Sequence, residues 1–125
     1  MNFVDRVKFD SHGLVVVVAQ DFKSKDVLMV AYMNRESLER TINEGIACYW
    51  SRSRQKLWVK GETSGNKQKV KEIRIDCDRD AIVLLVEQKG GACHTGYDTC
   101  FFTRYKDGKE EIVGTKVFNP DEVYS

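Results

Sequence analysis

Short runs of β-branched and other apolar residues, each bounded by turn residues, limit most strongly how this chain can fold. We expect a strand at each of them: residues 14–20, 27–33, 46–51, 57–60, 70–76, 81–88, 101–105 and 111–118. Helical spacing occurs at residues 34–45, where Asn34 is the expected N-cap, Leu38 and Ile42 lie four apart, and Gly45 follows the last turn. The sequence therefore predicts an α+β fold: a mainly antiparallel, strand-rich single domain with one main helix.

The ends and connections of the chain are consistent with one domain over residues 1–125, because no repeat, low-complexity tract or Pro/Ser-rich linker interrupts it. Asp107-Gly108 supplies the positive-φ positions of a tight hairpin between the last two runs. Pro120 is expected to mark a frayed tail, His12 a surface turn, and Cys48 a small buried side chain.

The net charge and the first residues of the sequence indicate the class of partner and the cellular compartment. The net charge of +1 provides no overall field that would attract nucleic acid or an anionic membrane. The sequence begins without an apolar leader, so we expect a cytoplasmic protein whose four cysteines stay reduced. Thiols in that setting indicate metal ligands, catalytic groups or buried small side chains before they indicate disulfides.

An acidic alternation, Asp-Cys-Asp-Arg-Asp, follows the fifth run. If it is extended, Asp76, Asp78 and Asp80 share one face and Cys77 points to the other. Three carboxylates this close repel one another unless a cation binds, and their oxygens suit Mg²⁺ or Ca²⁺. A solvated strand end is the simpler interpretation. An EF-hand calcium loop is excluded, because Ala81 stands where glycine is required and an apolar strand follows.

Three spaced thiols, Cys77, Cys93 and Cys100, carry a second possible metal signal. Their spacing differs from the paired C-x-x-C of structural zinc sites and is weak by itself. Three thiolates can nevertheless hold Zn²⁺ with a fourth position open, as in a catalytic site. His94 is then either a fourth ligand or a group that handles protons. Because Cys77 faces away from its aspartates, we expect two separate metal sites and hypothesise a zinc site completed by another chain.

Basic and aromatic residues alternate through residues 50–60. Arg52 and Arg54 would lie on one strand face, where their guanidinium groups can bind phosphate. The polar turn at residues 61–66 would bring backbone N–H groups and hydroxyls near a ligand. An exposed strand with ordinary ion pairs and a surface that stacks nucleic-acid bases are the alternatives. A net charge near zero favours a small phosphorylated ligand over a long polyanion.

Four stretches, residues 19–41, 49–66, 75–88 and 92–102, resemble the phosphoribosyl-AMP cyclohydrolases of histidine biosynthesis. The specific part is Asp-Cys-Asp-Arg-Asp combined with Cys-His-Thr-Gly and a following cysteine. The resemblance implies an intertwined homodimer that depends on zinc and magnesium, with its zinc site completed across the dimer. It also implies opening of the adenine ring of N1-(5-phosphoribosyl)-AMP, without the second activity of members that carry a fused pyrophosphohydrolase domain.

Carried over by position, the resemblance implies a set of site residues. They are Cys77, Cys93 and Cys100 for zinc; Asp76, Asp78 and Asp80 for magnesium; and Trp50, Ser51, Arg52, Arg54, Lys60, Glu62, Thr63 and Ser64 for substrate. His94, beside a zinc ligand, is the expected proton acceptor for the attacking water.

Two other functions remain open at this point. A zinc nucleobase deaminase also attacks an aminopurine carbon, but its H-x-E and P-C-x-x-C elements are absent from the sequence. A small RNA-binding module stabilised by zinc would instead couple metal binding to folding.

Overall fold

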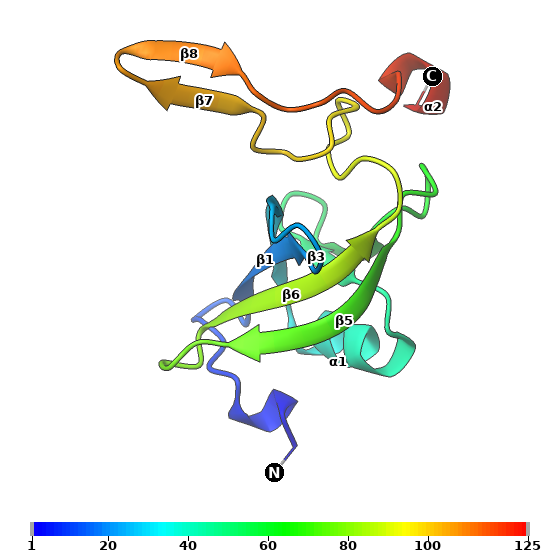
Figure 1. Cartoon of the computed structure of the whole chain (residues 1–125). Coiled ribbons are helices and arrows are strands. Elements are labelled where there is room, and N and C mark those ends of the chain that lie inside the picture. The colour runs from blue at the N-terminus through cyan, green and yellow to red at the C-terminus, as the bar shows by residue number, and fades with distance from the viewer. Residues whose placement is uncertain (1, 125) are drawn as a thin grey trace.

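The computed structural model describes residues 2–124. Its elements, in chain order, are η1 (Val4–Arg6), β1 (Val15–Asp21), β2 (Val27–Met33), α1 (Arg35–Glu44), β3 (Cys48–Ser51), β4 (Lys56–Val59), β5 (Gln68–Ile75), β6 (Ala81–Gln88), β7 (Thr103–Lys106), β8 (Lys109–Ile112) and α2 (Pro120–Tyr124). The sheet and α1 form the body, while the β7–β8 hairpin and α2 lie apart from it, beyond the end of β6 (Figure 1). Among the described residues, no helix has the length and apolar character needed to cross a membrane.

The main sheet has the order β2-β1-β6-β5. Its pairs are antiparallel except β1 and β6, which run parallel with Val17 opposite Ile82. The parallel pair requires a long connection, and the chain between β1 and β6 contains β2, α1, the β3–β4 hairpin and β5. The continuous apolar run of β6 is typical of such a central strand, and Leu84 and Val86 are fully buried. The predicted strand-rich, mainly antiparallel α+β domain is confirmed.

Helix α1 begins and ends where its caps predict. The Asn34 side chain accepts a hydrogen bond from the Ser37 N–H at 2.8 Å, and the Ser37 hydroxyl accepts one from the Asn34 N–H at 2.9 Å. Gly45 ends the helix in the left-handed conformation with φ 72°. Leu38 packs into the core at 0% exposure, whereas Ile42 is 41% exposed, so the buried face is narrower than the sequence predicts.

The C-terminal part departs from prediction in two places. The strand expected over residues 111–118 ends at Ile112, because Val117 donates its N–H to the Gly96 carbonyl (2.7 Å) instead of continuing the hairpin. The frayed tail expected at Pro120 is wrong: this proline opens α2, where its fixed φ suits the first helical position. The Asp107-Gly108 hairpin turn is confirmed, with φ 53° and 76°.

Candidate functional site

A cavity of about 850 Å³ opens between the β3–β4 hairpin and the loop that follows β6. Its wall brings together residues that are far apart in the sequence. Eight of the predicted site residues line it: Ser51, Arg54, Lys60, Glu62, Thr63, Ser64, His94 and Cys100. Met29, Trp58 and Phe101 add apolar surface. A mainly apolar wall with a few convergent polar groups is typical of a small-molecule site.

Trp50 and Arg52 line a neighbouring depression of about 510 Å³. The Arg52 guanidinium lies 4.0 Å from the centroid of the Tyr32 ring, within cation–π range. Both cavities share Trp58 and Ser53, so the depression adjoins the main cavity. Arg52 and Arg54 lie in the β3–β4 turn and line different cavities, so the expectation that they share one strand face is wrong. The predicted substrate segment forms two adjoining walls.

The polar loop at residues 61–66 is held by its backbone geometry and by a series of side-chain hydrogen bonds. Gly61 has φ 87°, and a Cβ there would come within 2.5 Å of the Asn66 carbonyl carbon, so glycine is required. The Asn66 carbonyl accepts a hydrogen bond from Gln88 Nε2 at 3.0 Å. Gln88 Oε1 in turn accepts one from the buried Gln68, at 2.8 Å. The wall of the cavity is thus tied to the end of β6.

Gln68 is a residue that the sequence reasoning missed. It is fully buried, and its Oε1 accepts a hydrogen bond from the Tyr49 hydroxyl at 2.6 Å. Its position before a predicted strand carries no signal of burial, since the burial results from packing against Met29 and Tyr49.

Cys93 and Cys100 meet beside the cavity. Cys93 is 5% exposed, and its Sγ lies 2.9 Å from the Thr95 hydroxyl. The Cys100 N–H donates to the Leu28 carbonyl at 2.7 Å, which holds this loop against β2. Cys100 is exposed as a residue, but desolvation of its sulfur and then its neighbour Cys93 raise the pKa of Cys100 to about 11, and the Lys60 ammonium acts in the opposite direction. His94 is exposed at the cavity wall.

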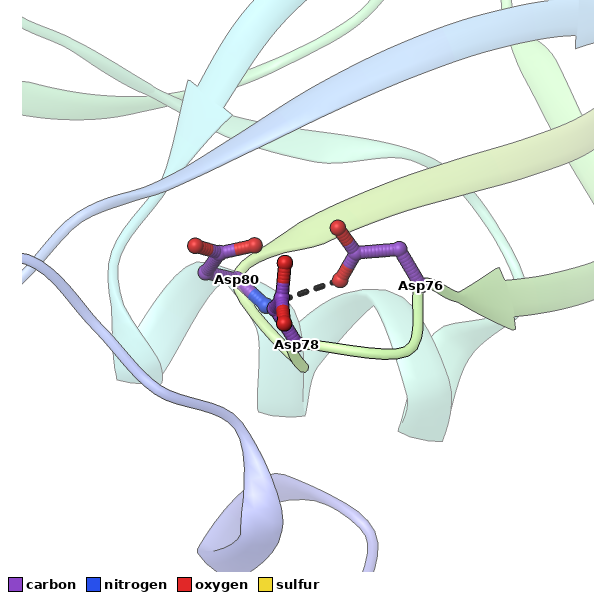
Figure 2. Close-up of side chains that lie close together, drawn as sticks. All are labelled: Asp76, Asp78 and Asp80. Atoms are coloured by element: carbon purple, nitrogen blue, oxygen red, sulfur yellow. Dashed lines mark hydrogen bonds between the residues drawn. The ribbon is translucent and has the colours of Figure 1, made fainter.

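The three aspartates lie in the β5–β6 turn and not in an extended strand, which corrects the sequence expectation. Arg79 adopts the left-handed conformation with φ 63°, which lets the chain reverse at this point. Its Nε donates a hydrogen bond to the Arg6 carbonyl at 2.7 Å. The carboxylates of Asp76, Asp78 and Asp80 still converge, with ligand oxygens within 4.8 Å of one another (Figure 2).

The pKa values of Asp76 and Asp80 in this turn are shifted in opposite directions. Desolvation opposes ionisation, but hydrogen bonds from the Asp80 N–H (3.0 Å) and Ala81 N–H (3.2 Å) hold the pKa of Asp76 below its usual value. A hydrogen bond with Asp76 and the charges of Asp76 and Asp78 raise the pKa of Asp80. Convergent carboxylates that oppose one another's ionisation fit the donor set of a hard divalent cation.

Cys77 lies in the aspartate turn before β6, whereas Cys93 and Cys100 follow the other end of that strand. Eight residues of strand are about 25 Å long at 3.3 Å per residue. A single chain therefore brings together two of the three predicted zinc ligands within residues 2–124, and Cys77 remains apart from them.

A cavity with cations and hydroxyls on one wall, and a histidine and a thiol on the other, is the arrangement of an enzyme that acts on a small polar molecule. The comparison with known proteins specifies this class. The family profile described as phosphoribosyl-AMP cyclohydrolase matches residues 29–102, more than half of the chain. The chain therefore belongs to the phosphoribosyl-AMP cyclohydrolase family.

Relatives extend this match over nearly the whole chain. The phosphoribosyl-AMP cyclohydrolase of Methanosarcina acetivorans is 61% identical over 121 residues, which cover 97% of this chain and 98% of the relative. That of Methanosarcina mazei is 66% identical over 113 residues, covering 90% and 92%. That of Chlorobium chlorochromatii is 57% identical over 122 residues, covering 97% and 89%.

Proposed function

We propose that this chain opens the adenine ring of N1-(5-phosphoribosyl)-AMP by hydrolysis. Water adds at C6 and the N1–C6 bond breaks, which gives the phosphoribosylformimino-AICAR phosphate intermediate of histidine biosynthesis. The observation that carries the proposal is the single cavity in which the basic hairpin, the polar loop and the His94–Cys100 segment converge. Membership of the cyclohydrolase family supports it.

The cavity suits a substrate with two phosphates. Arg54 and the hydroxyls of Thr63 and Ser64 offer charge-assisted and neutral hydrogen bonds on one wall. Arg52 stands in the adjoining depression beside Trp50, where it can bind a second phosphate. Trp58 borders both spaces and offers an aromatic face to the purine.

The paired thiols would supply two ligands of a zinc site. Cys93 and Cys100 interact directly, and thiolate sulfur is a preferred zinc ligand, but two ligands do not complete a site. We propose that Cys77 of a second copy supplies the third ligand. When bound, zinc lowers the pKa of a coordinated water to about 7.

The extended hairpin supports a dimer. Every residue of β7 and β8 is exposed, with Tyr105 75% and Ile112 59% accessible. A two-stranded hairpin by itself is marginally stable in water, so we propose that a second copy packs against its exposed Tyr105 and Ile112 side chains. The arrangement that delivers Cys77 to the thiol pair also delivers Asp76, Asp78 and Asp80, which would hold Mg²⁺ near the substrate's phosphate or ribose oxygens.

His94 is the proposed proton carrier. Its imidazole lies at the cavity wall, next in the chain to Cys93. It would accept a proton as water adds at C6 and return that proton to N1 as the N1–C6 bond breaks.

The test follows the ultraviolet absorbance of purified protein mixed with phosphoribosyl-AMP, with and without a zinc chelator. We expect a spectral change of ring opening that the chelator abolishes and added zinc restores, with no ammonia released. Ammonia release would instead indicate deamination. An unchanged spectrum with zinc present would contradict the proposal.

A further inference from the structure

Lys60 is a buried cation at the edge of the cavity. It follows β4, is 9% exposed, and donates its backbone N–H to the Ala47 carbonyl at 3.1 Å. Lysine is rarely buried unless its charge is balanced. None of the ion pairs between described residues includes Lys60. Its ammonium therefore requires another partner.

The ammonium binds the loop that carries the paired thiols. Lys60 Nζ donates to the Ala92 carbonyl at 2.6 Å, across 32 positions of sequence. Ala92 is 1% exposed and directly precedes Cys93. Because the peptide is planar, a contact that holds its carbonyl also restrains the position of the Cys93 Cα, from which the thiol side chain extends.

Two thiols lie near the Lys60 ammonium. Lys60 and Cys100 line the same cavity, and the Ala92 carbonyl that accepts from Lys60 directly precedes Cys93. Three thiolates around one Zn²⁺ would carry a net charge of −1, which a cation next to the buried Cys93 would stabilise. Lys60 is the cation at this position.

We propose that Lys60 is a positioning residue of the thiol loop: its ammonium holds the Ala92 carbonyl and balances the charge of the Cys93 and Cys100 thiolates. The inference rests on the proposed function, because it supposes zinc on these thiols. It gives Lys60 a role different from the substrate contact that the family resemblance implies.

Two substitutions separate the parts of this role. K60M keeps the length of the side chain but removes both charge and donor, while K60Q removes the charge and keeps a donor for the Ala92 carbonyl. K69M, at an exposed position of β5, is the matched control. Thermal unfolding of the metal-free proteins confirms that each variant folds.

Zinc affinity is measured by competition with a chromophoric chelator. We expect K60M to bind zinc about 10- to 100-fold more weakly than the native protein, as for loss of a charged hydrogen bond. K60Q should lose less affinity and K69M none. Amide hydrogen exchange of the metal-free proteins should be faster over residues 92–97 in K60M and near native in K60Q.

Native zinc affinity and native exchange in K60M, together with a higher KM for phosphoribosyl-AMP, would overturn the inference and make Lys60 a phosphate contact. If the native protein binds no zinc, the proposed function fails independently. The exchange measurement then still decides whether Lys60 holds the loop, and an unchanged rate in K60M contradicts it.

Discussion

Removal of one hydroxyl tests how the cavity wall is held. Tyr49 is fully buried, and its hydroxyl donates to Gln68 Oε1 at 2.6 Å. In Y49F this acceptor stays buried without its donor, which costs about 1–3 kcal/mol of unfolding free energy. At about 2.1 cal/mol/K per residue, each kcal/mol lowers the Tm of a 125-residue chain by about 4 °C. The expected shift is therefore about 4–11 °C.

Calorimetry and urea titration of Y49F measure this shift, with Y32F as a control that removes a hydroxyl from a half-buried ring. Replacing Gln68 with leucine in Y49F removes the acceptor as well, so the double variant should lose less than the sum of the single losses, by about 0.5–3 kcal/mol. Because Gln88 links Gln68 to the Asn66 carbonyl, we also expect KM to rise more than kcat falls. A Tm within 1 °C of native in Y49F, on the scale of about 4 °C per kcal/mol, would refute the reasoning.

Three other predictions concern catalysis, binding and acid stability. H94A should lose kcat by about a hundredfold or more and change the pH profile of kcat, and near-native kcat with an unchanged profile would exclude His94 as proton carrier. R54A should raise KM more than it lowers kcat in steady-state kinetics, and an effect on kcat alone would contradict a binding role. Hydrogen bonds from the Leu14 and His12 N–H groups lower the pKa of Asp10, so this carboxylate stabilises the fold above its unfolded pKa of 3.8 and loses that effect as pH falls through the lowered value. D10N should therefore be less stable than the native protein at pH 7 in urea titrations, with the difference vanishing in acid; a difference that persists there would contradict this.

Local signals in the sequence predicted the parts of the fold that local interactions determine. The caps Asn34 and Gly45 set α1, and Asp107-Gly108 set the hairpin, because each acts through its own backbone. The aspartate segment was expected to be extended, but the left-handed Arg79 and hydrogen bonds accepted by Asp76 make it a turn.

Long-range packing explains what the sequence could not predict at the site. Most of the predicted substrate-binding residues line one cavity. The sequence could predict them because the motifs themselves contain the polar side chains. The sequence did not predict the burial of Lys60 and Gln68. Each is buried against a hydrogen-bond partner that is distant in the chain, Ala92 for Lys60 and Tyr49 for Gln68. The separation of Cys77 from the other thiols follows from the length and direction of β6, which local patterns do not reveal.

Mixing two inactive variants tests most directly whether two chains share one catalytic site. C77S retains Cys93 and Cys100, and C93S retains Cys77, so a mixed dimer contains one complete site. After unfolding and refolding together, random pairing should restore about a quarter of native ring-opening activity, with zinc bound in proportion. Activity in the mixture no higher than that of the separate variants, with mixed dimers present, would contradict the account.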